Sequence, residues 1–196
     1  MASGADRDEA ADAALLSDLS AFLAAEKAPS VPIQWVEDGS YLRFTATLDV
    51  GEVTEDRARL MGRAHASMPD RSVSLTLTWQ GAAVRPQPFE RFEWRPHDRH
   101  TNKPIVPKPH RHRIIETTHR HPLALNARVA GGLAAAMAEN LPAAEALAQD
   151  PPDWAAFTAA AAAAWQIPAL VHLPPPPWQY DLLPFADTAR RGGRGR

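Results

Sequence analysis

The chain contains no cysteine among its 196 residues. Disulfide bonds and thiolate metal ligands are therefore excluded, so any metal would have to be held by nitrogen and oxygen atoms. Lysine is also scarce, with 3 residues against 18 arginines. An arginine excess together with abundant alanine is typical of a bacterial protein from a GC-rich genome, so this excess does not by itself indicate nucleic-acid binding.

Long hydrophobic runs are missing as well. The most apolar stretch, residues 157–173, is mainly alanine and includes Gln166 and Pro168, so it is too short and too weakly apolar to span a bilayer. The N-terminal region is acidic and lacks the basic and apolar segments of a secretory signal. We therefore expect a cytoplasmic protein that does not associate with a membrane.

The length and composition are those of one globular domain. Hydrophobic residues make up 45% of the chain and charged residues 22%, and 196 residues are enough to bury a core. No internal repeat or sharp change of composition divides the chain. We predict a single domain over residues 1–189, followed by a disordered basic tail, RRGGRGR, over residues 190–196.

The first half of the chain changes from a helical period to a strand period. Leucine and phenylalanine at helical spacing predict a helix over residues 8–27, which the prolines at 29 and 32 end. Alternating apolar and polar residues then predict a series of strands, although a helix remains an alternative for residues 57–65. The expected strands are residues 33–37, 40–50, 57–65, 72–79, 88–95 and 110–115.

The last third of the chain returns to helix. Residues 126–148 predict two short helices or one bent helix, and Asp150 is the expected N-cap of a helix over residues 154–165. Residues 173–183 are rich in proline, and we expect them to cross the body in extended form with Trp178 and Leu182 as anchors. The order of elements predicts an α+β fold: an antiparallel β-meander of about five or six strands, with the N-terminal helix and the C-terminal helices packed on one face.

Charge is unevenly distributed along the chain. Residues 85–128 contain ten basic and four acidic residues, a net charge of +6, whereas the rest of the chain carries −8. A basic segment inside an acidic protein indicates either an anionic partner or a segment neutralised by the protein's own acidic helices. The charge pattern leaves both interpretations open.

Histidine is concentrated in the same region, with six residues between positions 97 and 121. His110 and His112 are two apart on an expected strand, so both rings would project from one face and could bind a metal. We expect His97 and His100 as further ligands, and Asp98, Glu116, His119 or His121 could complete the set. Zn²⁺, Fe²⁺ or Mn²⁺ bound in this way would support hydrolysis or oxygen chemistry.

A second interpretation of residues 91–121 is a surface for a phosphate-bearing partner, RNA or DNA. The basic residues that we expect to contact phosphate are Arg91, Arg95, Arg99, Lys103, Lys108 and Arg111. If such a surface were also catalytic, His110 and His112 could serve as acid and base, with Arg113 stabilising the oxyanion.

Two further interpretations need no ligand in this region. The histidines could form a polar strand face, and the domain could be a protein-interaction module that uses its acidic N-terminal helix or the prolines at 174–177. Of the functional hypotheses, we favour the phosphate-bearing partner, with a metal-dependent enzyme second and a protein-interaction module third.

Overall fold

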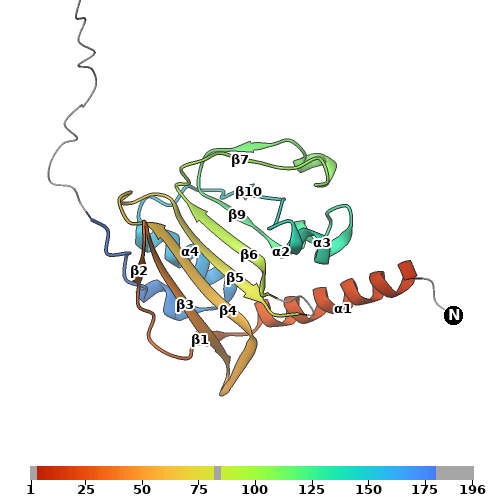
Figure 1. Cartoon of the computed structure of the whole chain (residues 1–196), viewed down its shortest axis with the longest axis horizontal. Coiled ribbons are helices and arrows are strands. Elements are labelled where there is room, and N and C mark those ends of the chain that lie inside the picture. The colour runs from red at the N-terminus through yellow and green to blue at the C-terminus, as the bar shows by residue number, and fades with distance from the viewer. Residues whose placement is uncertain (1–3, 82–84, 180–196) are drawn as a thin grey trace, which may run out of the picture.

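The fold is built around one large antiparallel sheet. The computed structural model describes residues 4–81 and 85–179, with side chains from residue 9 onward. The sheet has eight strands in the order β1-β3-β4-β5-β6-β9-β10, and β2 pairs with the same edge of β3 as β1 does (Figure 1). These strands are β1 Lys27–Pro29, β2 Val36–Asp38, β3 Tyr41–Val50, β4 Val53–His65, β5 Val73–Trp79, β6 Gln87–Trp94, β9 His119–His121 and β10 Glu145–Ala146.

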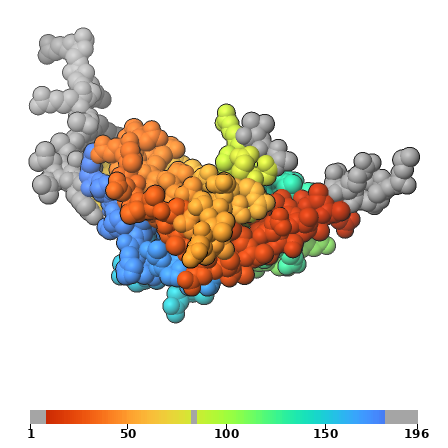
Figure 2. All heavy atoms as spheres, turned by 90° about the horizontal axis from the view of Figure 1, so that it is seen from below, coloured from red at the N-terminus to blue at the C-terminus, as the bar shows by residue number. Residues whose placement is uncertain are grey.

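The long helices cover one face of this sheet. They are α1 Gly4–Ala24 and α4 Trp154–Trp165, the latter followed by a short 3-10 helix, η2 Pro168–His172. Phe22 of α1 meets the edge of Trp79 at a centroid distance of 5.5 Å, and Trp165 of α4 meets Phe92 at 5.2 Å. Figures 1 and 2 both show the N-terminal part of α1 extending beyond the sheet. The predicted α+β meander with helices on one face is confirmed, with more strands than expected.

Alternation of side chains decides which face of each strand is buried. In β5, Val73, Leu75 and Leu77 are completely buried, while the hydroxyl residues between them point the other way. The stretch over residues 57–65 belongs to β4 and is a strand rather than the alternative helix, because it pairs along its length with both β3 and β5. Gly62 of β4 lies under the ring of Phe44, and a Cβ at this position would be 2.0 Å from that ring.

The prediction of a sixth strand over residues 110–115 is wrong. The segment is instead a 3-10 helix, η1 Lys108–His110, then a turn, and a two-residue strand, β8 Ile114–Ile115. β8 pairs with β7 His100–Thr101 in a separate two-stranded sheet. Pro107 and Pro109 cannot donate ladder hydrogen bonds, and His112 has a φ of 58°, which breaks an extended conformation.

Between β9 and α4 the chain forms two short helices, α2 Leu123–Asn126 and α3 Gly132–Ala138. Their separation follows the prediction, because Gly131 has a φ of 98° that ends regular helix there. The carboxylate of Asp12 in α1 accepts hydrogen bonds from Leu133 N at 2.7 Å and Ala134 N at 3.1 Å. This contact caps α3 and ties it to α1.

The end of the described chain also departs in part from expectation. The N-cap of α4 is Asp153 rather than Asp150, because its carboxylate accepts a hydrogen bond from Ala156 N at 2.8 Å. Trp178 is 7% exposed and packs against Trp94 and Trp154, so its predicted role as an anchor is confirmed. Leu182 and the tail over residues 190–196 lie outside the described residues. Of the described helices, none combines the length and apolar character that a bilayer crossing requires.

Candidate metal centre

The face of the sheet opposite the helices carries two rows of mainly polar side chains. Strand register places Glu93 of β6 opposite His119 of β9, and Arg91 opposite His121. The rows continue across β5, β4 and β3 because neighbouring strands pair in register. One row is Arg43, Arg63, Ser74, Glu93 and His119, and the other is Thr45, Met61, Thr76, Arg91 and His121.

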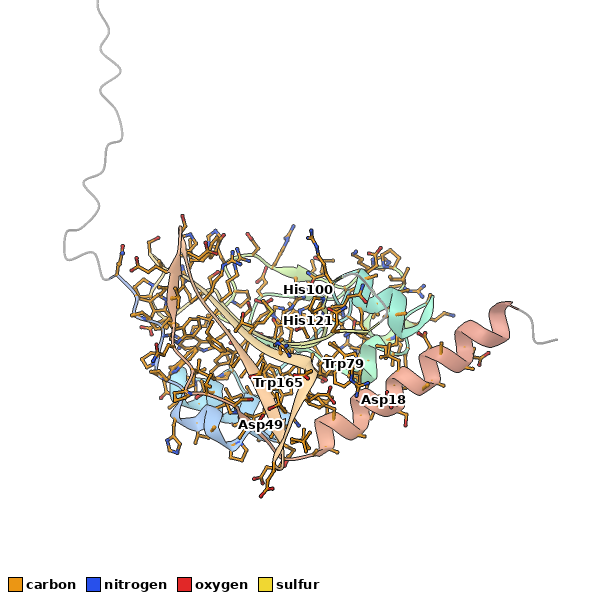
Figure 3. The ribbon with its side chains drawn as sticks, turned by 60° about the horizontal axis from the view of Figure 1, so that its bottom comes forward. Asp18, Asp49, Trp79, His100, His121 and Trp165 are labelled. Atoms are coloured by element: carbon orange, nitrogen blue, oxygen red, sulfur yellow. The ribbon has the colours of Figure 1, made fainter. Side chains whose placement is uncertain are left out.

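Three histidines meet at the β9 end of these rows. His119 and His121 point to the same side of β9, and His100 of β7 lies against both, with ring centroids 5.5 Å and 4.7 Å away. Each ring offers one ligand nitrogen, and these three atoms lie within 4.8 Å of one another. Figure 3 shows His100 beside His121. We call His100, His119 and His121 the histidine cluster.

Each ring of the cluster donates one N–H to a fixed oxygen. Nδ1 of His119 donates to Thr117 O at 2.9 Å, and Nδ1 of His121 donates to Leu141 O at 2.7 Å. Nε2 of His100 donates to Oδ1 of Asn102 at 3.0 Å. A carbonyl oxygen only accepts, so the nitrogen that faces it carries the proton, and in His119 and His121 the other nitrogen keeps a lone pair. His100 also forms a hydrogen bond with the backbone of Pro142. Metal-binding histidines are oriented in this way.

Asn102 fixes the position of His100. This residue is completely buried, and its Oδ1 also accepts a hydrogen bond from Ala144 N at 2.8 Å. Its Nδ2 donates to Ala144 O and His110 O, both at 2.9 Å, so the side-chain amide orientation is determined. Asn102 therefore joins the β7–β8 hairpin to the segment before β10 and orients the His100 ring.

Two residues with an unusual backbone conformation position the groups that bind His121 and Arg91. Asn140 and Leu141 have φ values of 58° and 60°, which non-glycine residues rarely adopt. This conformation brings Leu141 O to His121 and the Asn140 side chain to Arg91. Backbone strain of this kind is concentrated at functional sites in folded proteins.

Burial keeps the cluster neutral. Desolvation lowers the pKa of His119 to about 4 and holds the pKa of His121 well below its usual value. Desolvation also lowers the pKa of His100, although the hydrogen bonds to Asn102 and to the backbone of Pro142 oppose this effect. Neutral imidazole is the form that binds metal ions, so these rings are in the binding form at pH 7.

Arg91 and Glu93 complete the surroundings of the cluster. Nη2 of Arg91 lies 3.3 Å from Nε2 of His121, and Nη1 donates to Oδ1 of Asn140 at 3.1 Å. Nε of Arg91 lies 3.1 Å from Oε1 of Glu93. Desolvation raises the pKa of Glu93, while the positive charge of Arg91 opposes this effect. Arg91 therefore occupies the lone pair of His121 with which a metal would bond.

The cluster opens into a cavity of about 260 Å³. Its wall also contains Ser72, Arg91, Glu93, Pro96, His97, Asp98 and Arg99. The cavity adjoins a larger trough of about 600 Å³ over the polar face of β3 to β6, and Arg91 and Glu93 line both. A small molecule in the trough would thus have access to the histidine cluster.

No family model, curated protein or solved structure matches this chain.

The predicted metal ligands are only partly brought together. His100 belongs to the cluster, and His97 is exposed in the wall of the cavity. His110 lies in η1 and lines a separate cavity with Arg113, whereas His112 is exposed in a turn. The expectation that His110 and His112 project together from a strand is therefore corrected.

The predicted phosphate contacts are spread over several surfaces. Arg91 and Arg99 line the histidine cavity, and Arg95 donates to Pro152 O at 2.6 Å. Lys103 pairs with Glu139, and Arg111 donates to Val106 O. Lys108 is exposed in η1. Their assignment to a phosphate-bearing partner remains a prediction.

Two identical tripeptides carry the candidate histidines, and the sequence favoured the one that lies outside the histidine cluster. His-Arg-His occurs at residues 110–112 and again at 119–121, and only the second lies on a strand of the main sheet. The first follows Pro107 and Pro109, which disfavour a strand. This signal was available in the sequence, whereas the role of Asn102 depends on contacts between distant segments.

Proposed function

We propose that this protein is a zinc-dependent hydrolase with His100, His119 and His121 as the metal ligands. The observation that carries the proposal is the orientation of the three rings. Each donates one N–H to a fixed carbonyl oxygen, and one ligand nitrogen from each converges with the others to within 4.8 Å. Converging, neutral imidazoles with fixed tautomers are a prepared set of metal ligands.

The ligand set favours zinc among the divalent metals expected from the sequence. Three imidazole nitrogens suit Zn²⁺ or Fe²⁺ better than Mn²⁺, which prefers oxygen. Three protein ligands leave a fourth position for water, and a zinc ion in such a site makes a nucleophile of that water near neutral pH. The adjoining cavity offers space for a substrate at that position.

We assign roles in the proposed hydrolysis to two residues of the cavity wall. Glu93 lies opposite His119 across the strand pair, and its carboxylate serves as the proton acceptor during attack by water. Arg91 is oriented by Asn140 and stabilises negative charge that develops on the substrate. A metal on Nε2 of His121 would take the place of the Arg91 guanidinium there, and the contacts of Arg91 to Asn140 and Glu93 would keep it beside the site.

The metal content of untagged protein after dialysis tests the proposal. We expect about one equivalent of zinc in the wild type and none in the His119→Ala/His121→Ala variant. His110→Ala/His112→Ala protein should keep its zinc. This result would distinguish the histidine cluster from His110 and His112, the pair that the sequence favoured as ligands. His65→Ala/His172→Ala is the matched control, because both residues lie outside the cavity.

Cobalt substitution gives a second readout that does not require activity. Co²⁺ bound by three histidines should produce visible absorption bands in the wild type that are absent in the His119→Ala/His121→Ala variant. Circular dichroism establishes whether that variant is folded, and His119→Gln replaces it if it is not. Metal-free wild-type protein that neither gains thermal stability nor changes its spectrum with Zn²⁺ or Co²⁺ would overturn the proposal.

A further inference from the structure

The trough contains an arginine that an aromatic ring holds in place. The guanidinium of Arg63 in β4 stacks on the ring of Tyr41, with its Cζ 3.8 Å from the ring centroid. Arg63 is exposed and forms no hydrogen bond or salt bridge with any described residue, and its charge acts on the carboxylate of Glu93 without a direct contact. Stacking on an aromatic ring holds the guanidinium in place while its N–H donors stay free for a ligand.

A second arginine lies near the same ring. The Cζ of Arg43 in β3 is 5.4 Å from the centroid of Tyr41, and its Nε pairs with Asp38 at 2.8 Å. Arg43 and Arg63 are directly opposite each other in strand register. Two neighbouring guanidinium groups on one rigid strand pair attract an oxyanion.

Hydroxyl groups line the floor between these arginines and the histidine cluster. Ser74 and Thr76 of β5 lie between β4 and β6 in the two polar rows. Thr78 of β5 also lines the trough; it is 5% exposed, and its Oγ1 has no hydrogen-bond partner among the described residues. A buried hydroxyl without a partner is rare, and a polar ligand group in the trough would satisfy it.

The distance between the arginine pair and the cluster limits the length of the ligand. β4 and β9 are separated by β5 and β6, so three strand spacings place Arg63 and His119 about 14 Å apart along the row. The trough has a volume of about 600 Å³, which is within the range of small-molecule sites. A ligand that reaches both ends must therefore span about 14 Å, a length that an extended small molecule has.

We infer that the trough binds an extended, hydroxyl-bearing small molecule whose oxyanion group, phosphate or carboxylate, is held by Arg63 and Arg43. This inference rests on the proposed function, because it places the scissile bond of the same molecule at the histidine cluster. The charge of the trough supports this ligand class: Arg43, Arg63 and Arg91 line it against Glu93 and Asp98. Arg63 is then a residue that determines specificity, distant from the reacting atoms.

Binding of inorganic pyrophosphate to metal-free protein tests the inference without zinc. After dialysis against a chelator, titration calorimetry at low ionic strength should detect one pyrophosphate site in the wild type. Arg63→Gln should weaken it at least tenfold, and Arg63→Lys should weaken it less because it keeps the charge. Arg128→Gln is the matched control, since it removes one exposed positive charge outside the trough.

Tricarballylate serves as the carboxylate probe beside pyrophosphate. Tighter binding of one probe, reduced by Arg63→Gln, supports the inference and identifies the oxyanion as phosphate or carboxylate. Absence of binding for both probes, or equal affinities in wild-type and Arg63→Gln protein, would overturn it. Arg63→Gln should retain zinc and His119→Ala/His121→Ala should retain pyrophosphate binding, so the two proposals can fail separately.

Discussion

Metal-free protein should lose stability on mild acidification because of the histidine cluster. His119 is 2% exposed, and desolvation lowers its pKa to about 4, whereas an unfolded chain has the ordinary value of 6.5. Between these two values the unfolded chain binds a proton that the folded protein does not. The free energy of unfolding therefore rises with pH in this range and falls as the pH drops from 6.5 towards 4.

The size of the effect follows from the two pKa values of His119. A difference of about 2.5 between them corresponds to about 3 kcal/mol when the pH falls below both. Most of this stabilisation is lost when the pH is lowered from 7 to 4.5. We therefore expect His119 alone to lower the free energy of unfolding by about 2 kcal/mol over this range. His121 should add to the loss, because burial lowers its pKa too.

Urea unfolding of chelator-treated protein at pH 7 and pH 4.5 measures this loss. In His119→Gln protein the difference between the two pH values should shrink by about 2 kcal/mol. His172→Gln is the control, because His172 is exposed in η2, and it should leave the difference unchanged. An equal loss in wild-type and His119→Gln protein would refute the assignment of the effect to burial of His119.

Three further substitutions test other parts of the structure. Gly62→Ala should lower the free energy of unfolding by about 2–3 kcal/mol in urea titrations, because its Cβ would overlap the ring of Phe44. Gly81→Ala, whose Cβ would meet nothing closer than 4.0 Å, should have a much smaller effect, and equal effects would contradict the packing argument. Asp12→Ala should cost about 1 kcal/mol through loss of the α3 cap, measured in the same way, and a change below the error of the titration would rule out the cap. Arg91→Gln should tighten zinc binding about tenfold in chelator competition, because it removes a competing donor and a positive charge beside His121, and weaker binding would be the contrary result.

Periodicity in the sequence was sufficient to predict most of the sheet. The alternation of β5 is visible in the sequence, and its apolar residues are the ones buried. β4 was ambiguous because three of the residues on its buried side, Ala58, Gly62 and Ala64, are small, so that Leu60 alone gives strong hydrophobic contrast there. Pairing with strands on both sides, which no local pattern reveals, decides its structure.

The site was less predictable than the fold. The concentration of histidines directed attention to residues 91–121, and the structure brings His100, one of the expected ligands, together with His119 and His121. The convergence of His100 with β9 depends on Asn102, whose four hydrogen bonds join segments 42 residues apart. Such contacts form only once the chain is folded, so spacing alone could not identify which histidines meet.

The edge strands of the sheet limit self-association of the protein. The longest strands, β3 and β4, lie inside the strand order, and the outermost strands β1, β2 and β10 have only three, three and two residues. β1 also ends at Pro29, which has no N–H to offer a further strand. Short edges of this kind present few free backbone groups to another chain. The described sheet is therefore a poor template for edge-to-edge aggregation, although its interior is rich in β-forming sequence.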